Sequence, residues 1–222
     1  MDRAGAGVRR AAAPSAQQDG ARRRADRGRV RVSGVRLLAA APTPALRRAV
    51  FGGDDDDLDE GGLRAALALS EQDGTDLGGR TDLWVCAPSQ AALQTARALG
   101  HDDPLIDKAL ADPGYGTWSG LGLGDVAGRD PDGLRAWLTD PGAAPHGGES
   151  LADVRRRAGA WLDTQVEQRT VAVAHPVVVR AALTHALGLP DAAVWQLDVA
   201  PLSLTRLTHR TGRWHVSFPP AG

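Results

Sequence analysis

The sequence predicts an α/β domain of three layers, in which a mostly parallel sheet carries helices on both faces. Three short runs, at residues 35–39, 83–87 and 170–174, are rich in branched or aromatic apolar residues, which is typical of strands buried on both faces. A helical pattern follows each run. This alternation favours a parallel sheet, because parallel strands need a long connection between them.

The helical segments follow the three runs in order. After the first run come apolar-periodic segments at 45–51 and 63–69. After the second run, residues 90–99 form a helical pattern that stops at Gly100, a residue that favours helix ends. After the third run, residues 177–187 predict a further helix.

Two more elements complete the predicted domain. Ser150 and Asp153 form an S-x-x-D capping box, which predicts the start of a longer helix. Apolar runs at 202–207 and 214–218, separated by a polar turn, predict an antiparallel hairpin at the sheet edge.

Length and composition limit the class of protein. The chain has 222 residues, enough for one ordinary domain, and 42% of them are hydrophobic. No apolar run is long enough for a membrane span, and the single cysteine, Cys86, excludes an internal disulfide. We therefore expect a cytoplasmic protein without membrane contact.

The charges divide the chain into two parts. Residues 1–30 carry eight Arg and three Asp with hardly a large apolar side chain, so we expect residues 1–31 to be a disordered tail. An extension from a misassigned start and a functional basic arm are the alternatives. Residues 32–222 form the predicted domain, and its mildly acidic charge gives no reason to expect nucleic-acid binding.

In open α/β sheets, ligands bind at the carboxyl ends of the strands. This rule directs attention to residues 39–43, 87–91 and 175–180. The candidate site is therefore expected where the three predicted strands end.

Four segments, in order and at matching spacing, resemble the histidine phosphatase superfamily, the phosphoglycerate-mutase-like fold. They are APSQAALQTARALG (87–100), LADPGYGTWSGLGLGDV (110–126), PHGGESLADVRRRAGAWL (145–162) and VAVAHPVVVRAALTHALGLP (171–190). The resemblance covers about residues 32–218 and implies the same α/β fold.

The chain departs from the family pattern where the family binds phosphate. The first strand of the family ends in Arg-His, and its His receives the phosphoryl group. Here Pro42 and Thr43 fix the register, so the Arg place is Ala39 and the His place is Ala40. The second pocket arginine falls at Ala91. The resemblance therefore implies a degenerate member that lacks the nucleophile.

Two groups of the family site remain. His175 matches the second histidine, and Asp112 aligns with the proton-donor carboxylate. A methyl group at Ala40 cannot accept a phosphoryl group. We therefore expect a repurposed enzyme, in which His175 and Asp112 act as acid and base on a non-phosphorylated small molecule, in a cyclisation, isomerisation, elimination or hydrolysis.

Two other functions stay open. One is a non-catalytic pseudophosphatase that binds a ligand or partner. The other is a residual phosphomonoester hydrolase, in which His175 or a water attacks, with helix N-terminal amides holding the anion weakly. We expect three alanines to leave a roomy, less polar pocket. The expected pocket-lining residues are Ala39, Ala40, Thr43, Ala91, Tyr115, Trp118 and Arg180.

Simpler interpretations compete with some of these assignments. His175 can be a relic, Asp112 a turn residue, and Arg180 a structural ion-pair partner. Glu149 stands just before a helix start, where the helix dipole favours an acid. No metal or cofactor is expected, and the acidic run 54–57 is interpreted as an exposed loop. The expected partner is a small molecule, and a homodimer stays open.

Overall fold

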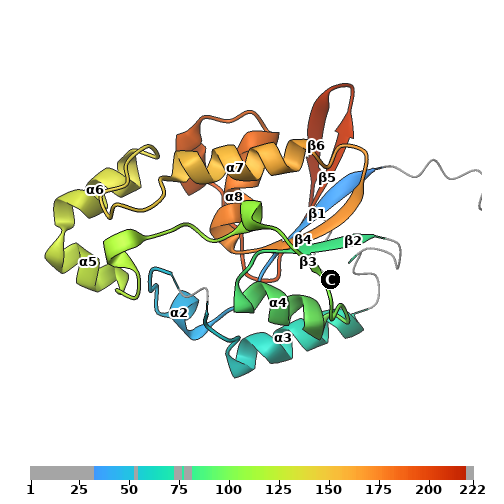
Figure 1. Cartoon of the computed structure of the whole chain (residues 1–222), viewed down its shortest axis with the longest axis horizontal. Coiled ribbons are helices and arrows are strands. Elements are labelled where there is room, and N and C mark those ends of the chain that lie inside the picture. Colours follow the sequence, from blue (N-terminus) through green and yellow to red (C-terminus); the bar gives the residue numbers. More distant parts are fainter. Residues whose placement is uncertain (1–32, 53–54, 73–76, 78–81, 219–222) are drawn as a thin grey trace, which may run out of the picture. The chain divides into compact units, whose positions relative to one another are not determined.

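A six-stranded mixed sheet lies at the centre of the domain (Figure 1). The computed structural model describes residues 33–52, 55–72, 77 and 82–218. The fold given below is that of the compact unit that begins at Ser33. The predicted tail at 1–31 and Asp54 lie outside the described residues.

The strand order is β3-β2-β4-β1-β5-β6. The first four strands in this order are parallel, while β5 and β6 form the antiparallel hairpin that the sequence predicts. The strands are β1 (Gly34–Ala39), β2 (Leu83–Cys86), β3 (Leu105–Ile106), β4 (Arg169–Ala174), β5 (Leu204–Arg210) and β6 (Arg213–Ser217).

Helices cover both faces of this sheet, with α3 and α4 on one side and α7 and α8 on the other (Figure 1). The predicted α/β fold class is therefore confirmed. The helices are α2 (Pro44–Arg47), α3 (Glu60–Glu71), α4 (Gln90–Ala98), α5 (Leu123–Arg129), α6 (Pro131–Thr139), α7 (Leu151–Asp163) and α8 (Pro176–Ala186), with 3-10 turns η1 (Lys108–Leu110), η2 (Gly116–Trp118) and η3 (Asp191–Trp195).

The central strands are apolar because both of their faces are covered. In β4, Val171 and Val173 are fully buried, as are Leu37 and Leu38 in β1. The two strands run parallel with Ala39 opposite Ala174. The residues that follow the strands, Ala40 and His175, therefore lie next to each other at the carboxyl end of the sheet.

A buried carboxylate joins three parallel strands near their amino ends. Asp82 precedes β2, and its Oδ2 accepts a hydrogen bond of 3.1 Å from Arg36 of β1. Its Oδ1 lies 3.0 Å from Nε of Arg169, at the start of β4. These ion pairs hold the three strands together at their amino ends, opposite the end at which the candidate site is expected.

Helix α7 begins as the capping box predicts. The Ser150 hydroxyl accepts a hydrogen bond of 3.2 Å from the Asp153 amide and donates one of 2.8 Å to the Asp153 carboxylate. The side chains of Leu151, Val154 and Leu162 on the inner face are buried.

One predicted helix is shorter than expected. Residues 45–51 were expected to be helical, but α2 ends at Arg47. Val50 instead forms an antiparallel bridge with Gly122, and the Phe51 amide donates a hydrogen bond of 2.9 Å to the Leu121 carbonyl. Because this pairing needs extended backbone, it ends the helix early and connects the segment after β1 to the start of α5.

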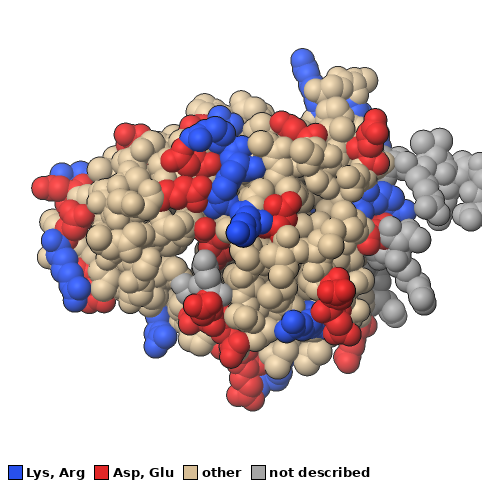
Figure 2. All heavy atoms as spheres, in the orientation of Figure 1, with Lys and Arg blue, Asp and Glu red and all other residues tan. Residues whose placement is uncertain are grey.

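The visible face carries charges of both signs. A row of basic side chains over α7 lies beside acidic groups (Figure 2). Arg155 and Arg156 of α7 form ion pairs with Asp191 and Asp153, respectively. No helix in the described ranges has the length and apolar character needed to cross a membrane.

Candidate functional site

Two cavities lie at the carboxyl ends of the parallel strands. The larger has a volume of about 610 Å³ and the smaller about 20 Å³. Asp112, His175, Leu46 and Pro176 line both. The small cavity is also lined by Ala40, Ala41, Thr43, Ser89 and Ala91. Asp112 and His175 therefore lie between the two spaces.

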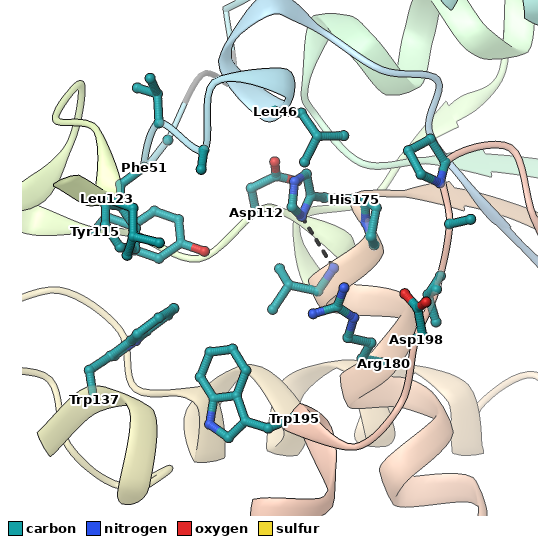
Figure 3. Close-up of a pocket in the computed structure, with 18 of the residues that line it drawn as sticks. Leu46, Phe51, Asp112, Tyr115, Leu123, Trp137, His175, Arg180, Trp195 and Asp198 are labelled. Atoms are coloured by element: carbon teal, nitrogen blue, oxygen red, sulfur yellow. Dashed lines mark hydrogen bonds between the residues drawn. The ribbon is translucent and has the colours of Figure 1, made fainter. Parts of the chain in front are cut away.

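His175 is fixed at the junction of β4 and α8. It is the N-cap residue of α8, and its Nδ1 accepts a hydrogen bond of 3.2 Å from the Val177 amide (Figure 3). A neutral imidazole that accepts at Nδ1 carries its proton on Nε2. Burial, and to a lesser degree the nearby Arg180 guanidinium, lowers the pKa of His175 to about 4. The ring is therefore a neutral hydrogen-bond donor at physiological pH.

The start of α8 offers no spare amide to an anion. Pro176 has no N–H, and the Val177 amide is bonded to the His175 ring. The amides of Val178 and Val179 both donate to the His175 carbonyl, at 2.9 and 3.1 Å. The expected contribution of helix N-terminal amides is therefore absent from the first turn of α8.

Asp112 stands in a loop held by an ion pair that the sequence did not predict. Arg157 of α7 donates to both carboxylate oxygens of Glu149, at 2.7 and 2.8 Å. The same guanidinium donates to the carbonyl oxygens of Ala109 and Asp112, at 2.9 and 3.4 Å. Glu149, interpreted from sequence as a helix-dipole residue, therefore orients an arginine that supports the Asp112 loop.

Backbone contacts hold the same loop from its other side. The Glu149 amide donates a hydrogen bond of 2.7 Å to the Gly114 carbonyl, and the Thr117 amide donates one of 2.9 Å to the His146 carbonyl. A Cβ on Gly148 would collide with the Gly114 carbonyl. Gly148 is thus needed because two backbones cross here, while Gly147 is favoured because its φ is +70°.

The three alanines expected in the pocket occupy two different environments. Ala40 and Ala91 line the small cavity with Thr43, as expected. Ala39 is fully buried and lines neither cavity, which differs from the expectation. The alanines also leave no roomy pocket: the space beside them is about 20 Å³, because the surrounding backbone and the neighbouring Leu46 fill the rest.

Arg180 lines the large cavity beside His175, as expected (Figure 3). Its Nε is buried and has no hydrogen-bond partner in the described part of the chain. Asp198, which sequence reasoning missed, lies on the same side of the cavity. Arg47 pairs with Asp59 at the surface, so it does not supply a second cation to the cavity.

An aromatic wall faces these polar groups across the large cavity (Figure 3). Tyr115 lines it as expected, together with Phe51, Trp137 and Trp195, which the sequence did not single out. The ring centroids of Trp137 and Trp195 are 4.6 Å apart, and those of Phe51 and Trp137 are 5.4 Å apart. Trp118 lies behind this wall, against Phe51, and lines neither cavity.

Part of this wall rests on a buried histidine. His146 is 1% exposed, and its ring centroid lies 4.9 Å from that of Trp118. Its Nδ1 accepts a hydrogen bond of 3.0 Å from the Gly148 amide, and burial lowers the pKa of His146. Among the described residues, no group of His, Cys, Asp and Glu has the arrangement of a metal site.

The model of the histidine phosphatase superfamily (branch 1) matches residues 41–219. The chain belongs to this superfamily. Solved structures agree with the match. A mycobacterial glucosyl-3-phosphoglycerate phosphatase in complex with VO3 is 28% identical, with a TM-score of 0.72, over 84% of this chain and 98% of that one.

Curated relatives are more similar in sequence over shorter spans. A glucosyl-3-phosphoglycerate phosphatase of Mycolicibacterium vanbaalenii is 34% identical over 151 residues, 61% of this chain and 65% of the relative. A bifunctional protein of Mycobacterium tuberculosis is 34% identical over 148 residues, 58% of this chain. The chain spans only 40% of that protein's length.

These relatives correct the functional expectation drawn from the sequence. We expected acid–base catalysis by His175 and Asp112 on a non-phosphorylated small molecule. Relatives with a named activity are instead phosphatases: the glucosyl-3-phosphoglycerate phosphatase, and a phosphoserine phosphatase of Hydrogenobacter thermophilus that is 26% identical over 166 residues, 70% of this chain and 77% of the relative. The expectation of a non-phosphate substrate is therefore wrong.

Proposed function

We propose that the chain hydrolyses a phosphate monoester without forming a phosphohistidine. The names of its relatives support the phosphoester as the substrate class. The observation that carries the proposal is the position of Asp112 and His175 in the shared wall of the two cavities. The large cavity has room for an ester, and the small one lies directly behind its phosphoryl group.

The proposal that no phosphohistidine forms rests on Ala40, which stands where the family has its nucleophilic histidine. Ala40 lies beside His175, since its amide donates a hydrogen bond of 2.8 Å to the carbonyl of Ala174, the last residue of β4. A methyl group has no lone pair with which to attack phosphorus. The family match begins at residue 41, just after this altered segment, which agrees with a departure from the family pattern there.

A water molecule is the nucleophile that the site can accommodate. The small cavity of about 20 Å³ holds a single water, for which about 10–15 Å³ is enough. Thr43, Ser89 and His175 give that water polar neighbours. The cavity adjoins the space in which the ester would bind, so the water is directed at the phosphorus atom.

Two side chains stabilise the charge on the phosphoryl oxygens. The Nε2–H of His175 and the guanidinium of Arg180, which both line the large cavity, are the side-chain donors to an anion on this side. A charge-assisted hydrogen bond contributes about 1.5–3 kcal/mol. With only one guanidinium in this set, we expect slow turnover.

The reaction is then a direct displacement. The water oxygen forms a bond to phosphorus, and the ester P–O bond breaks. Asp112, in its protonated form, donates a proton to the leaving oxygen, and a proton of the attacking water passes to a phosphoryl oxygen. Solvent then restores the Asp112 proton, and the products are an alcohol and inorganic phosphate.

Phosphate release from alkyl and p-nitrophenyl phosphates tests this function. We expect His175→Ala to lower kcat at least about 100-fold on both substrates. Asp112→Asn should lower kcat about 100-fold on the alkyl ester and far less on the p-nitrophenyl ester, whose leaving group needs no proton.

The exposed residues His215 and Asp103 provide matched controls, as His215→Gln and Asp103→Asn, and both variants should keep full activity. The proposal fails if no phosphomonoester is hydrolysed, or if His175→Ala releases phosphate as fast as the unmodified chain.

A further inference from the structure

The large cavity is divided by polarity. Its charged lining residues, Asp112, Arg180 and Asp198, lie on one side with His175, while the aromatic wall lies on the other (Figure 3). Of the described residues that line it, Arg180 is the only cation, and Asp198 shares its side. A ligand with a second anionic group therefore finds no second positive side chain in this set.

Apart from the Tyr115 hydroxyl, the aromatic wall presents carbon to the cavity rather than hydrogen-bonding groups (Figure 3). The indole nitrogens of Trp137 and Trp195 are buried and have no acceptor among the described residues. Because these N–H groups are not accessible, the surfaces that the two rings offer the cavity are apolar. Phe51 and Leu46 extend the same surface toward the polar side.

The mouth of the cavity is apolar as well. Leu123 of α5 and Leu138 of α6 line the cavity and are 41% and 46% exposed. Exposed leucines that border a cavity of about 610 Å³ are positioned to bury their surface against an apolar ligand.

We propose that the ester's alcohol part is an apolar ring or hydrocarbon chain, which lies against the aromatic wall and the two rim leucines while the phosphoryl group meets His175 and Arg180. This inference rests on the proposed function and adds the substrate class. It distinguishes the chain from relatives named for glucosyl-3-phosphoglycerate and phosphoserine, whose substrates carry a carboxylate besides the phosphate.

A series of esters tests the inference. We expect kcat/KM to rise from methyl to butyl to hexyl phosphate, at least about tenfold overall, because each fully buried methylene contributes about fourfold. 2-(1-Naphthyl)ethyl phosphate, an alkyl ester with a similar leaving group, should match the hexyl ester, and phosphoserine should resemble the methyl ester. The alcohols released from these esters should bind more tightly in the same order, as measured by thermal shift.

The rim provides variants with matched controls. Leu138→Gln and Leu123→Gln should each lower the ratio of kcat/KM for hexyl over methyl phosphate about threefold to tenfold. Leu67 and Leu63 of α3 are 45% and 43% exposed but do not line the cavity. Leu67→Gln and Leu63→Gln should leave that ratio unchanged, and denaturant unfolding checks that all four variants fold.

The outcomes separate the two proposals. Equal kcat/KM values on methyl, hexyl and 2-(1-naphthyl)ethyl phosphates, or a preference for phosphoserine, would overturn the substrate class while leaving the hydrolase in place. The same conclusion follows if the rim and control variants behave alike. Failure to hydrolyse any ester, methyl phosphate included, overturns the proposed function itself.

Discussion

The folded protein keeps the His175 imidazole neutral. Its Nδ1 accepts from the Val177 amide, while burial and the nearby Arg180 guanidinium lower the pKa of the ring to about 4. Protonating this nitrogen would break the hydrogen bond that caps α8. The features that make the ring a neutral donor in the site therefore also link the stability of the fold to pH.

We predict that the free energy of unfolding falls as pH is lowered from 7 to 4. An unfolded histidine takes up a proton near pH 6.5, whereas folded His175 resists protonation until about pH 4. Acid therefore favours the unfolded state across this window, by about 3 kcal/mol at pH 4 for this residue. Buried His146, whose pKa is also lowered, adds in the same direction.

Urea unfolding at pH 7, 5.5 and 4 measures this effect. His175→Gln should remove most of the His175 contribution, and His215→Gln, at a solvent-exposed position, should keep it. A His175→Gln variant with the full pH dependence of the unmodified chain would contradict this description of the imidazole.

At the scale of elements, the position of Asp112 depends on α7. Arg157 of this helix contacts Glu149 and the carbonyl oxygens of Ala109 and Asp112. The guanidinium can make all of these contacts because it is planar and has five N–H donors. Arg157 is thus a positioning residue, since it acts on the reaction only through the Asp112 loop.

We predict that Arg157→Lys lowers kcat about tenfold on alkyl phosphates with little change in KM, because a misplaced Asp112 no longer reaches the leaving oxygen. On p-nitrophenyl phosphate the loss should be smaller. Arg156→Lys, at an exposed position on the same helix, is the matched control and should be neutral. Equal losses on both esters would mean that Arg157 supports the fold rather than Asp112.

The sequence predicted elements well where the signal was local. The buried strands are visible in the sequence as short apolar runs. Ser150 predicts the start of α7 because its hydroxyl caps the helix. The predicted helix at 45–51 failed because its end is set by pairing with residues 120–122, which are distant in sequence. Local patterns cannot encode such a partner, and the Glu149–Arg157 contacts were missed for the same reason.

At the scale of the whole domain, the site is assembled from segments spread from Leu46 to Pro201. His175 and Asp112 could be predicted because each stands in a recognisable segment beside a strand end or an acid-bearing loop. Phe51, Trp137 and Trp195 could not, since only the folded chain brings these rings together. The proposed preference for an apolar over a polar substrate depends on these three rings.

The proposal that water attacks phosphorus directly rests on two features, the superfamily fold and Ala40 just after β1. The domain keeps the sheet and the cavity at its carboxyl edge, and it has a methyl group at position 40, beside the histidine that follows β4. Direct attack by water and transfer through a phosphohistidine differ in one observable way. A single displacement inverts the configuration at phosphorus, and a double displacement retains it.

The decisive measurement is the stereochemical course of hydrolysis. A phosphorothioate monoester made chiral with ¹⁶O and ¹⁸O is hydrolysed in H₂¹⁷O, so that the product is a chiral ¹⁶O,¹⁷O,¹⁸O-thiophosphate whose configuration can be read out. We predict inversion at phosphorus, because one water displaces the alcohol in a single step. Retention would reveal a covalent phospho-intermediate on another side chain and would contradict the account.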